Sequence, residues 1–267
     1  SELCRRDIIR HVITQNVDGL HRKSGIQEDK ISELHGTINK EYCKGCGMSY
    51  LRDFNVRDYS NTERKHKTLR NCVKCGSSLH DTIVYFGEPL PADVMERAKQ
   101  EANLGDLCIV IGSSLKVSPA SWFPRYFIDR EKPVAIINLQ KTHLDRSSQI
   151  RIGGLSDQVM ELLMKELNIE IPQFSIHRWI SFKVDDLGDH SIIRAKNYNR
   201  QKVEISAIKS VTLDLNADKA IFSDMTLETE PLQQIFHGKI HHLNCKISFF
   251  GHHQEKDFEF NFADFEN

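Results

Sequence analysis

Four cysteines at a fixed spacing constrain this chain more than any other feature. Cys43-Lys-Gly-Cys46 and Cys72-Val-Lys-Cys75 are two Cys-x-x-Cys pairs separated by 25 residues, and a glycine follows each pair. A Cys-x-x-Cys turn lets two thiolates reach one ion, and the following glycine relieves the crowded backbone. Two such turns supply four sulfur ligands, which suits a closed tetrahedral Zn²⁺ site. The sequence therefore predicts one structural zinc ion, held by Cys43, Cys46, Cys72 and Cys75 in a module at about 41–80.

Two other uses of these cysteines fit the sequence less well. Paired disulfides would need an oxidising compartment, and no stretch looks like a secretory signal. A redox Cys-x-x-Cys normally occurs once, at the start of a helix. A zinc ion with four thiolate ligands has no open position, so we expect the chemistry of the protein elsewhere. The other cysteines, Cys4, Cys108 and Cys245, are far apart in sequence and are expected to be buried thiols.

Composition is that of a globular protein in a reducing compartment. The 267 residues are 39% hydrophobic and 27% charged, which suffices for one large or two ordinary domains. No apolar run reaches the roughly 18 residues that a membrane span needs, so no membrane partner is expected. The formal net charge of −1 provides no overall field that would attract nucleic acid.

Short strand-like segments in the first two thirds of the chain end in polar residues. We predict strands at 11–15, 81–86, 107–111 and 133–137, and helices at 3–10, at 91–103 and from Ser156, as the cap, through Leu167. The apolar run at 107–111 is typical of a parallel sheet covered on both faces. Because ligands of parallel α/β sheets bind beyond the carboxyl ends of strands, the polar tips are candidate ligand contacts.

These tips also have simpler explanations. Gln15, Asn16 and Asp18 could converge on one polar ligand, but they could equally form an Asx-rich turn that satisfies its own backbone. Gly112-Ser113-Ser114 could receive a phosphate or a ribose, although that pattern alone is weak. His35 is a lone histidine, a type that is most often structural, and the glycine after it allows close approach of another group.

From Ser175 the hydrophobic period changes to two, which is typical of an antiparallel β module. We predict a separate β-rich domain at 175–267, with strands at 179–184, 203–215, 220–227, 240–250 and 258–262. The overall prediction is an α/β fold, a partial Rossmann-like parallel sheet with a zinc-binding module at 1–174, followed by an antiparallel all-β domain. Five histidines of this domain are expected to lie at the surface or in turns rather than on a metal: His237, His241, His242, His252 and His253. Four of them form two adjacent pairs, and adjacent residues of a strand point to opposite faces.

Taken together and in this order, the motifs of residues 1–174 resemble the sirtuin (Sir2) family. The resemblance leans to the class IV branch, the sirtuin-six and sirtuin-seven group, and within it to the sirtuin-seven side. The motifs that carry it are Thr14-Gln-Asn-Val-Asp-Gly-Leu-His, Glu33-Leu-His-Gly, the paired Cys-x-x-Cys, Val84-Tyr-Phe-Gly-Glu, Gly112-Ser-Ser-Leu-Lys-Val and Ile137-Asn-Leu-Gln. Their joint occurrence is far more specific than any single motif.

The resemblance implies an NAD-dependent protein-lysine deacylase, in which His35 is the general base that acts on the NAD ribose. An imidazole is largely neutral at pH 7 and can take a hydroxyl proton. The implied catalytic partners of His35 are Asn16 and Asp18. The implied cofactor contacts are Gln15, Gly112, Ser114, Asn138, Gln140 and Ser156, and the implied acyl-lysine channel consists of Val84, Phe86 and Gly87.

The resemblance also gives expectations for the substrates, for the cellular location and for how much of the catalytic core the chain contains. It implies acyl-lysine proteins as substrates, with histones among the candidates, and a nuclear location with the cytosol as second choice. The family's glycine-rich phosphate loop would precede the first motif, so we expect the chain to be an N-terminally truncated core that binds NAD weakly. The alternatives are an inactive truncated sirtuin that serves as a zinc-containing scaffold, and a zinc-ribbon nucleic-acid binder, which the near-neutral charge disfavours.

Overall fold

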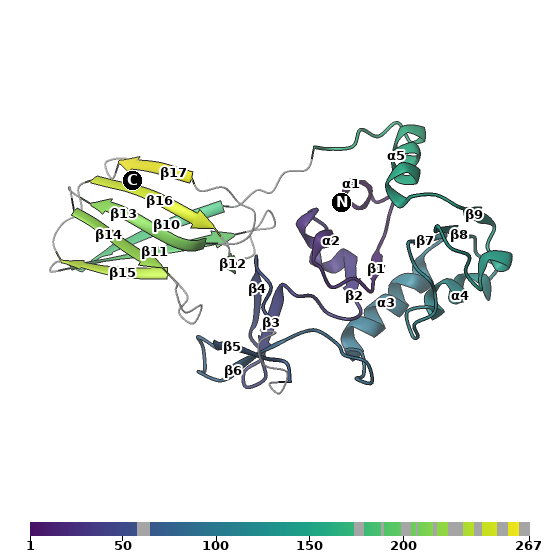
Figure 1. Ribbon diagram of the computed structural model, residues 1–267, viewed down its shortest axis with the longest axis horizontal. Helices are drawn as coiled ribbons and strands as arrows, with labels where there is room; N and C mark the ends of the chain where they lie inside the picture. The colour runs from purple at the N-terminus through teal and green to yellow at the C-terminus, as the bar shows by residue number, and fades with distance from the viewer. Residues whose placement is uncertain are drawn as a thin grey trace. The chain divides into compact units, whose positions relative to one another are not determined.

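The computed structural model describes residues 1–57 and 65–173 in full, and beyond them Leu187 and the backbone of the strands between 179 and 261. The chain divides into two compact units (Figure 1). The first unit comprises Ser1–His35 and Val84–Ser175, and the second comprises Gly36–Ile83 and Ile176–Asn267. None of the helices in the described part of the chain combines the length and the apolar character that a membrane span requires.

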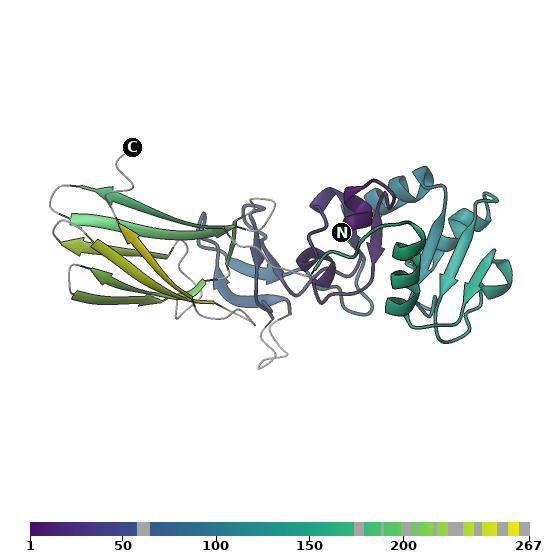
Figure 2. The same ribbon diagram turned by 90° about the horizontal axis from the view of Figure 1, so that it is seen from above.

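The first unit is built on parallel strands. β1 (Val12–Thr14) pairs with β2 (Ile31–Glu33), and a three-stranded sheet has the order β7 (Cys108–Ile111), β8 (Val134–Ile137), β9 (Ile150–Ile152). Figure 2 shows these last three strands side by side. Parallel strands need crossover connections, and helices supply them here. The predicted parallel α/β arrangement is thus confirmed for this unit.

Among the described residues, five helices and two short 3₁₀ turns lie before, between and after these strands. The helices are α1 (Glu2–Arg5), α2 (Leu20–Lys23), α3 (Ala92–Leu104), α4 (Trp122–Ile128) and α5 (Ser156–Glu166), and the turns are η1 (Glu28–Lys30) and η3 (Asp145–Ser147). α3 ends at Gly105, as predicted, and its buried alanines, Ala98 and Ala102, allow close packing against α4 and β2.

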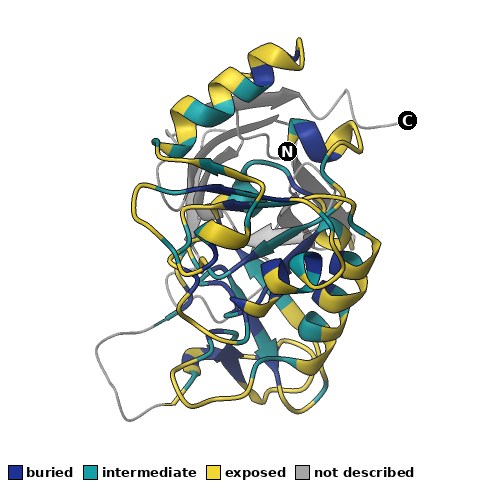
Figure 3. Ribbon diagram, turned by 90° about the vertical axis from the view of Figure 1, so that its right-hand side faces the viewer, coloured by how far each residue is buried: buried dark blue, intermediate teal, exposed yellow. Residues whose placement is uncertain are grey.

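The main core lies between these helices and the sheet. α4 contributes Phe123 and Phe127, and β8 contributes Val134 and Ile136, both fully buried. Leu34, which follows β2 directly, is also fully buried in this core. In Figure 3 the buried residues lie on strands and on parts of the helices, whereas the outer loops are mostly exposed. Burial of Leu34 fixes the chain immediately before His35, a predicted site residue.

The zinc-binding module is an antiparallel sheet within the second unit. β3 (Lys40–Cys43) pairs with β4 (Ser49–Arg52) and with β6 (Ser78–Asp81), which in turn pairs with β5 (Lys67–Asn71). Within the same unit, the short strand β12 (Glu204–Ser206) pairs in parallel with β4. Two strand pairs therefore carry the two cysteine turns.

A buried ionic cluster holds three strands of this module together. The carboxylate of Glu41 on β3 accepts from Nε of Arg52 on β4, at 2.7 Å, and from Nε of Arg70 on β5, at 2.8 Å. The side chains of these residues are 0%, 4% and 6% exposed, respectively. Arg70 also donates to the carbonyl oxygen of Val56 at 2.6 Å. Each buried charge thus has a charged partner with a directed hydrogen bond.

The Glu41→Gln variant should be strongly destabilised. Removing one partner of a buried ion pair leaves the other charges uncompensated, at a cost of about 3–5 kcal/mol. The free energy of unfolding from urea titration measures this loss. Glu166→Gln, a change of the same kind at an exposed position, is the control and should shift it by less than about 0.5 kcal/mol. Equal effects of the two substitutions would contradict the assigned role of the cluster.

The remaining strands lie in the C-terminal part of the chain. β10 (Trp179–Asp186) pairs with β11 (His190–Tyr198), which also pairs with β12 and with β15 (Leu232–His237). A four-stranded sheet has the order β14 (Asp218–Ser223), β13 (Ile208–Leu215), β16 (His242–Phe249), β17 (Lys256–Asn261). The side chains of the five histidines singled out from the sequence, and that of Cys245, lie outside the described residues.

Four local predictions were wrong. The helix expected at 3–10 ends at Arg5, because the chain turns at Asp7, whose φ is +56°. The strand expected at 81–86 is instead the extended segment that leaves β6, which ends at Asp81. Ser156 is the first residue of α5 rather than its cap, since Leu155 precedes the helix and no side-chain capping bond forms. The strand β7 is not fully covered on both faces by the described residues, because Ile111 at its end is 41% exposed and Ile109 is half-buried.

Candidate functional site

The first cluster of predicted site residues lies where β1 and β2 end. The two strands are parallel and in register, with Thr14 opposite Glu33, so Gln15 and His35 emerge at the same edge. Nδ1 of His35 lies 3.3 Å from the carbonyl oxygen of Gln15. A carbonyl oxygen can only accept, so this contact favours the proton on Nδ1 and leaves Nε2 as the proton acceptor. The arrangement is that of an oriented base.

Hydrogen bonds from backbone amides, two of them to side-chain oxygens, shape the loop that carries the polar residues. The amide of Asn16 donates to Oγ1 of Thr14 at 3.0 Å, and the amide of Leu20 donates to Oδ1 of Asp18 at 3.0 Å. Asp18 therefore forms the Asx turn that was the simpler explanation of this motif. The amide of Leu34 donates to the carbonyl oxygen of Thr14, which ties the loop to the chain before His35.

An ionic network that the motifs did not indicate supports the same edge. Nε of Arg22 on α2 donates to Glu33, the last residue of β2, at 2.7 Å, and Arg22 also pairs with Glu28. The side chains of Arg22 and Glu33 are 16% and 7% exposed. The network holds α2 against the end of the strand that leads to His35. A buried carboxylate such as Glu33 needs a partner, but the sequence alone does not say which cation supplies it.

The second group of predicted site residues follows β7 and β8. Ile111 is opposite Ile137 in the parallel pair, and the amide of Gly112 donates to the carbonyl oxygen of Ile137 at 3.0 Å. Gly112 and Asn138 therefore leave the sheet at one edge. Gly112 has φ of +64°, a conformation that glycine adopts without strain. The hydroxyl of Ser113 makes a local hydrogen bond, in which its Oγ accepts from the amide of Leu115 at 3.2 Å.

The predicted acyl-lysine segment starts beside His35. The amide of Val84 donates to the carbonyl oxygen of His35 at 3.0 Å. The segment then turns at Gly87, with φ of +89°, and Glu88 accepts from the amide of Tyr85. Phe86 at the tip is 97% exposed. An aromatic ring held out by a closed turn next to a histidine is available to an incoming peptide.

Gly36 packs very tightly against a neighbouring backbone segment. A Cβ at this position would lie 1.8 Å from the carbonyl oxygen of Thr82, and its φ is +74°. Two hydrogen bonds between Thr37 and Thr82 keep this close approach: the amide of Thr37 donates to Oγ1 of Thr82, and that hydroxyl donates to the carbonyl oxygen of Thr37. The close approach expected of the glycine after His35 is confirmed.

A Gly36→Ala substitution should lower the free energy of unfolding by about 2–5 kcal/mol, the sum of left-handed backbone strain and a steric clash. Gly25→Ala is the matched control. Gly25 also has a positive φ, +91°, but nothing lies within 4 Å of its added Cβ. The free energy of unfolding of the control should fall only by the cost of the backbone strain, about 1–2 kcal/mol. Thermal or urea unfolding of both variants measures the difference, and equal losses would contradict the contact with Thr82.

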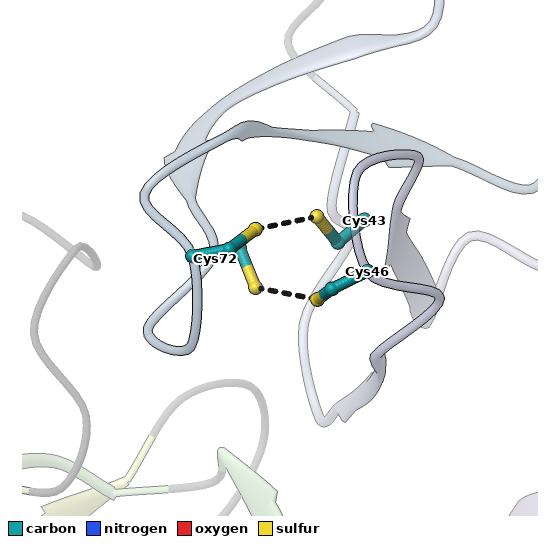
Figure 4. Close-up of side chains that lie close together, drawn as sticks. Cys43, Cys46 and Cys72 are labelled. Atoms are coloured by element: carbon teal, nitrogen blue, oxygen red, sulfur yellow. Dashed lines mark hydrogen bonds between the residues drawn. The ribbon is translucent and has the colours of Figure 1, made fainter.

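The four cysteines form one compact cluster. Their Sγ atoms all lie within 4.8 Å of one another, with Cys43–Cys75 at 3.4 Å and Cys46–Cys72 at 3.5 Å. Figure 4 shows the side chains of Cys43, Cys46 and Cys72 directed toward a common centre. Tetrahedral zinc with Zn–S of about 2.3 Å places its sulfurs about 3.8 Å apart. These separations fit the ion, and they exceed a disulfide bond of about 2.05 Å.

Two turns with the same hydrogen bond, and the phenol of Tyr50, surround the cysteine cluster and favour its thiolate form. The amide of Gly47 donates to the carbonyl oxygen of Cys43, and that of Gly76 donates to the carbonyl oxygen of Cys72 in the same way. The hydroxyl of Tyr50 contacts Sγ of Cys72 at 3.1 Å. Burial opposes ionisation of Cys72, but the Tyr50 hydroxyl and nearby backbone amides lower the pKa of its thiol to about 6. A thiolate is the form that binds zinc.

Known proteins are similar to this chain in sequence and in structure. The model of the Sir2 family matches residues 1–119. The NAD-dependent protein deacetylase SRT1 of Arabidopsis thaliana is 34% identical over 238 residues, and human sirtuin-7 is 40% identical over 190 residues. The structure of a Sir2 protein with p53 peptide and NAD+ is 31% identical, with a TM-score of 0.52, over 63% of this chain and 68% of that one. The chain belongs to the Sir2 family.

This sirtuin chain spans about half the length of the curated relatives it matches, 49% of the Arabidopsis protein and 46% of human sirtuin-7. The matches cover 86% and 67% of the chain itself. The structure of a Sir2 homolog–NAD complex is also similar, with 32% identity and a TM-score of 0.53 over 62% of this chain. The family indicated by the motifs, including its class IV branch, is thus confirmed.

Proposed function

We propose that the protein is an NAD-dependent protein-lysine deacylase. It transfers the acyl group from the lysine nitrogen to ADP-ribose, and nicotinamide is released. The observation that carries this proposal is the placement of His35 against the Gln15 carbonyl oxygen, at the edge where β1 and β2 end. Relatives named as NAD-dependent protein deacetylases, and similar structures named as complexes with NAD, support it.

Each predicted residue has a role in this proposal. His35 accepts a ribose hydroxyl proton at Nε2, while Nδ1 stays on the Gln15 carbonyl oxygen. Asn16 and Asp18 line the nicotinamide end. The remaining contacts to NAD come from the strand ends and from α5: Gln15, Gly112, Ser114, Asn138, Gln140 and Ser156.

The substrate in this proposal is an extended acyl-lysine peptide. The segment Val84, Phe86 and Gly87 lies beside His35 through the hydrogen bond of the Val84 amide, and it receives the acyl-lysine side chain. A similar structure is named as a Sir2 protein bound to acetylated peptide. We propose nuclear proteins, histones included, as the substrates, because the resemblance of the motifs to the sirtuin-seven side of the family implies them.

Zinc has a structural role in the proposal. Cys43, Cys46, Cys72 and Cys75 fill all four positions of a tetrahedral ion, so the metal shapes the module and takes no part in acyl transfer. We also propose that the strands from Trp179 onward form an antiparallel β module, which meets the zinc-binding sheet through the parallel pairing of β12 with β4. Its partner is not indicated by any feature of the sequence.

One assay separates the enzyme from an inactive zinc-containing scaffold. Purified full-length protein is incubated with an acetyl-lysine peptide, with and without NAD, and deacetylated peptide and nicotinamide are measured. The enzyme should release the two products in a 1:1 ratio and only with NAD. A zinc-loaded, folded protein that releases neither product from any of a panel of acyl-lysine peptides would leave the scaffold as the function.

A further inference from the structure

The loop after β8 is closed on itself by an aspartate that the motifs did not single out. Asp145, at the start of η3, accepts from the amide of Thr142 at 3.1 Å and from its hydroxyl at 2.5 Å, both through Oδ1. The backbone amide of Ser147 donates to the carbonyl oxygen of Leu144, which completes the short turn. The Thr142 hydroxyl and the Arg151 guanidinium hold the pKa of Asp145 below its usual range, so the carboxylate is charged at neutral pH.

Arg151 on the neighbouring strand β9 ties the loop after β8 to the sheet, and we call this set of bonds the clip. Nε of Arg151 on β9 donates to Oδ2 of Asp145 at 3.1 Å, and Nη2 of the same guanidinium donates to the carbonyl oxygen of Gln140 at 3.0 Å. The side chains of Arg151 and Asp145 are 23% and 18% exposed. A planar guanidinium can direct two donors at once in fixed geometry, which a lysine ammonium does not do.

The clip acts on two residues of the proposed cofactor edge. The carbonyl oxygen of Gln140 also accepts from Nδ2 of Asn138 at 3.0 Å, so Asn138, Gln140 and Arg151 meet at one oxygen. The amide of Asn138 donates to the carbonyl oxygen of Ile152 on β9, next to Arg151. The backbone amide of Asn138 and the carbonyl group of Gln140 are therefore held by β9, and Nδ2 of Asn138 bonds to the same Gln140 oxygen.

We propose that Asp145 and Arg151 are positioning residues for the adenosine half of NAD. They touch no reacting atom. They hold the loop 138–145 in the conformation that presents Asn138 and Gln140 to the cofactor. This inference rests on the proposed function, because it takes Asn138 and Gln140 as contacts to NAD.

The test compares cofactor binding with peptide binding in the full-length protein. Arg151→Met keeps the length of the side chain and removes both donors. It should raise the Kd of NAD and of ADP-ribose, and the KM of NAD, each about tenfold, because hydrogen bonds to charged groups are lost. The kcat and the KM of the peptide should stay within about twofold, since the loss falls on cofactor binding alone.

Further variants separate positioning from general stability. Arg151→Lys keeps the charge but cannot serve Asp145 and Gln140 together, so its Kd should lie between those of the native protein and Arg151→Met. Asp145→Asn is a milder change that should shift the Kd of ADP-ribose in the same direction and should not add fully to Arg151→Met, because both act through one network. The control is Arg146→Met, an exposed neighbour, which should bind ADP-ribose like the native protein.

Three results would overturn the inference. Unchanged Kd values in folded Arg151→Met and Asp145→Asn proteins would do so while leaving the proposed function standing. So would a loss of peptide binding in step with cofactor binding, which indicates a general loosening of the fold. A native protein that binds neither NAD nor ADP-ribose would overturn the proposed function itself, and with it this inference.

Discussion

The His35→Ala variant is expected to lose NAD-dependent deacylation by about 10²–10⁴-fold and to remain folded. The imidazole is the base in the proposed reaction, and alanine cannot accept a proton. The fold should persist, because the adjacent Leu34, and not His35, fills the core. The measurement is the rate of nicotinamide release with saturating NAD and acetyl-lysine peptide, together with the melting temperature. His35→Tyr, which restores bulk without restoring the base, should be equally inactive.

The control for this experiment is His143→Ala, which replaces an exposed histidine of the same unit. It should leave the rate unchanged within about twofold. Equal rates for native protein and both His35 variants would refute the assignment of the base. A His35→Ala protein that fails to melt cooperatively would show instead that this residue carries the fold.

Removal of zinc is expected to unfold the module at about 41–80. Binding of structural zinc is worth about 10–16 kcal/mol in small zinc domains, which equals or exceeds the total stability of most domains. Cys72→Ser should have the same effect, because it deletes one of four ligands and the Tyr50 contact. Metal analysis should give one zinc per chain in the native protein and much less in the variant. Loss of the cooperative unfolding transition on chelation measures the stability change.

Cys108→Ala is the matched control, since this cysteine lies outside the cluster and should leave zinc content at one per chain. The structural assignment of the metal would be wrong if completely zinc-free protein still melted cooperatively at the native temperature. A measured content of two zinc ions per native chain would contradict the expectation of one ion per chain.

The sequence was sufficient where a function needs residues close together along the chain. The cysteine turns follow from two four-residue patterns, and the cluster is confirmed. The strands at 108–111 and 134–137 follow from apolar runs, and their parallel pairing is confirmed. The implied roles of Gln15 and His35 put both residues at one cofactor, and the two lie side by side, although the strand β2 before His35 was not among the predicted strands.

The sequence was insufficient where partners are distant and chemically common. Glu41, Arg52 and Arg70 look like ordinary surface charges, because nothing local says that three strands bury them together. The pairing of Asp145 with Arg151 could not be predicted either, because it depends on which loop faces which strand. Local backbone conformation was also missed, as at Asp7, where a positive φ ends the first helix.

The cysteines that the structure describes differ in chemical reactivity. Burial raises the pKa of the Cys108 thiol to about 12, and burial also raises that of Cys4. Both therefore stay protonated in the cell and react slowly with electrophiles and peroxides. Within the metal-binding turns, Cys75 is exposed and the pKa of Cys72 is lowered to about 6. The backbone amide of Met48 lowers the pKa of Cys46, but burial and the neighbouring cysteines outweigh it and raise this pKa to about 12. An alkylating reagent or an oxidant would thus attack the metal-binding turns first, once the ion leaves, and the rate of alkylation would report how much of the protein has lost its zinc.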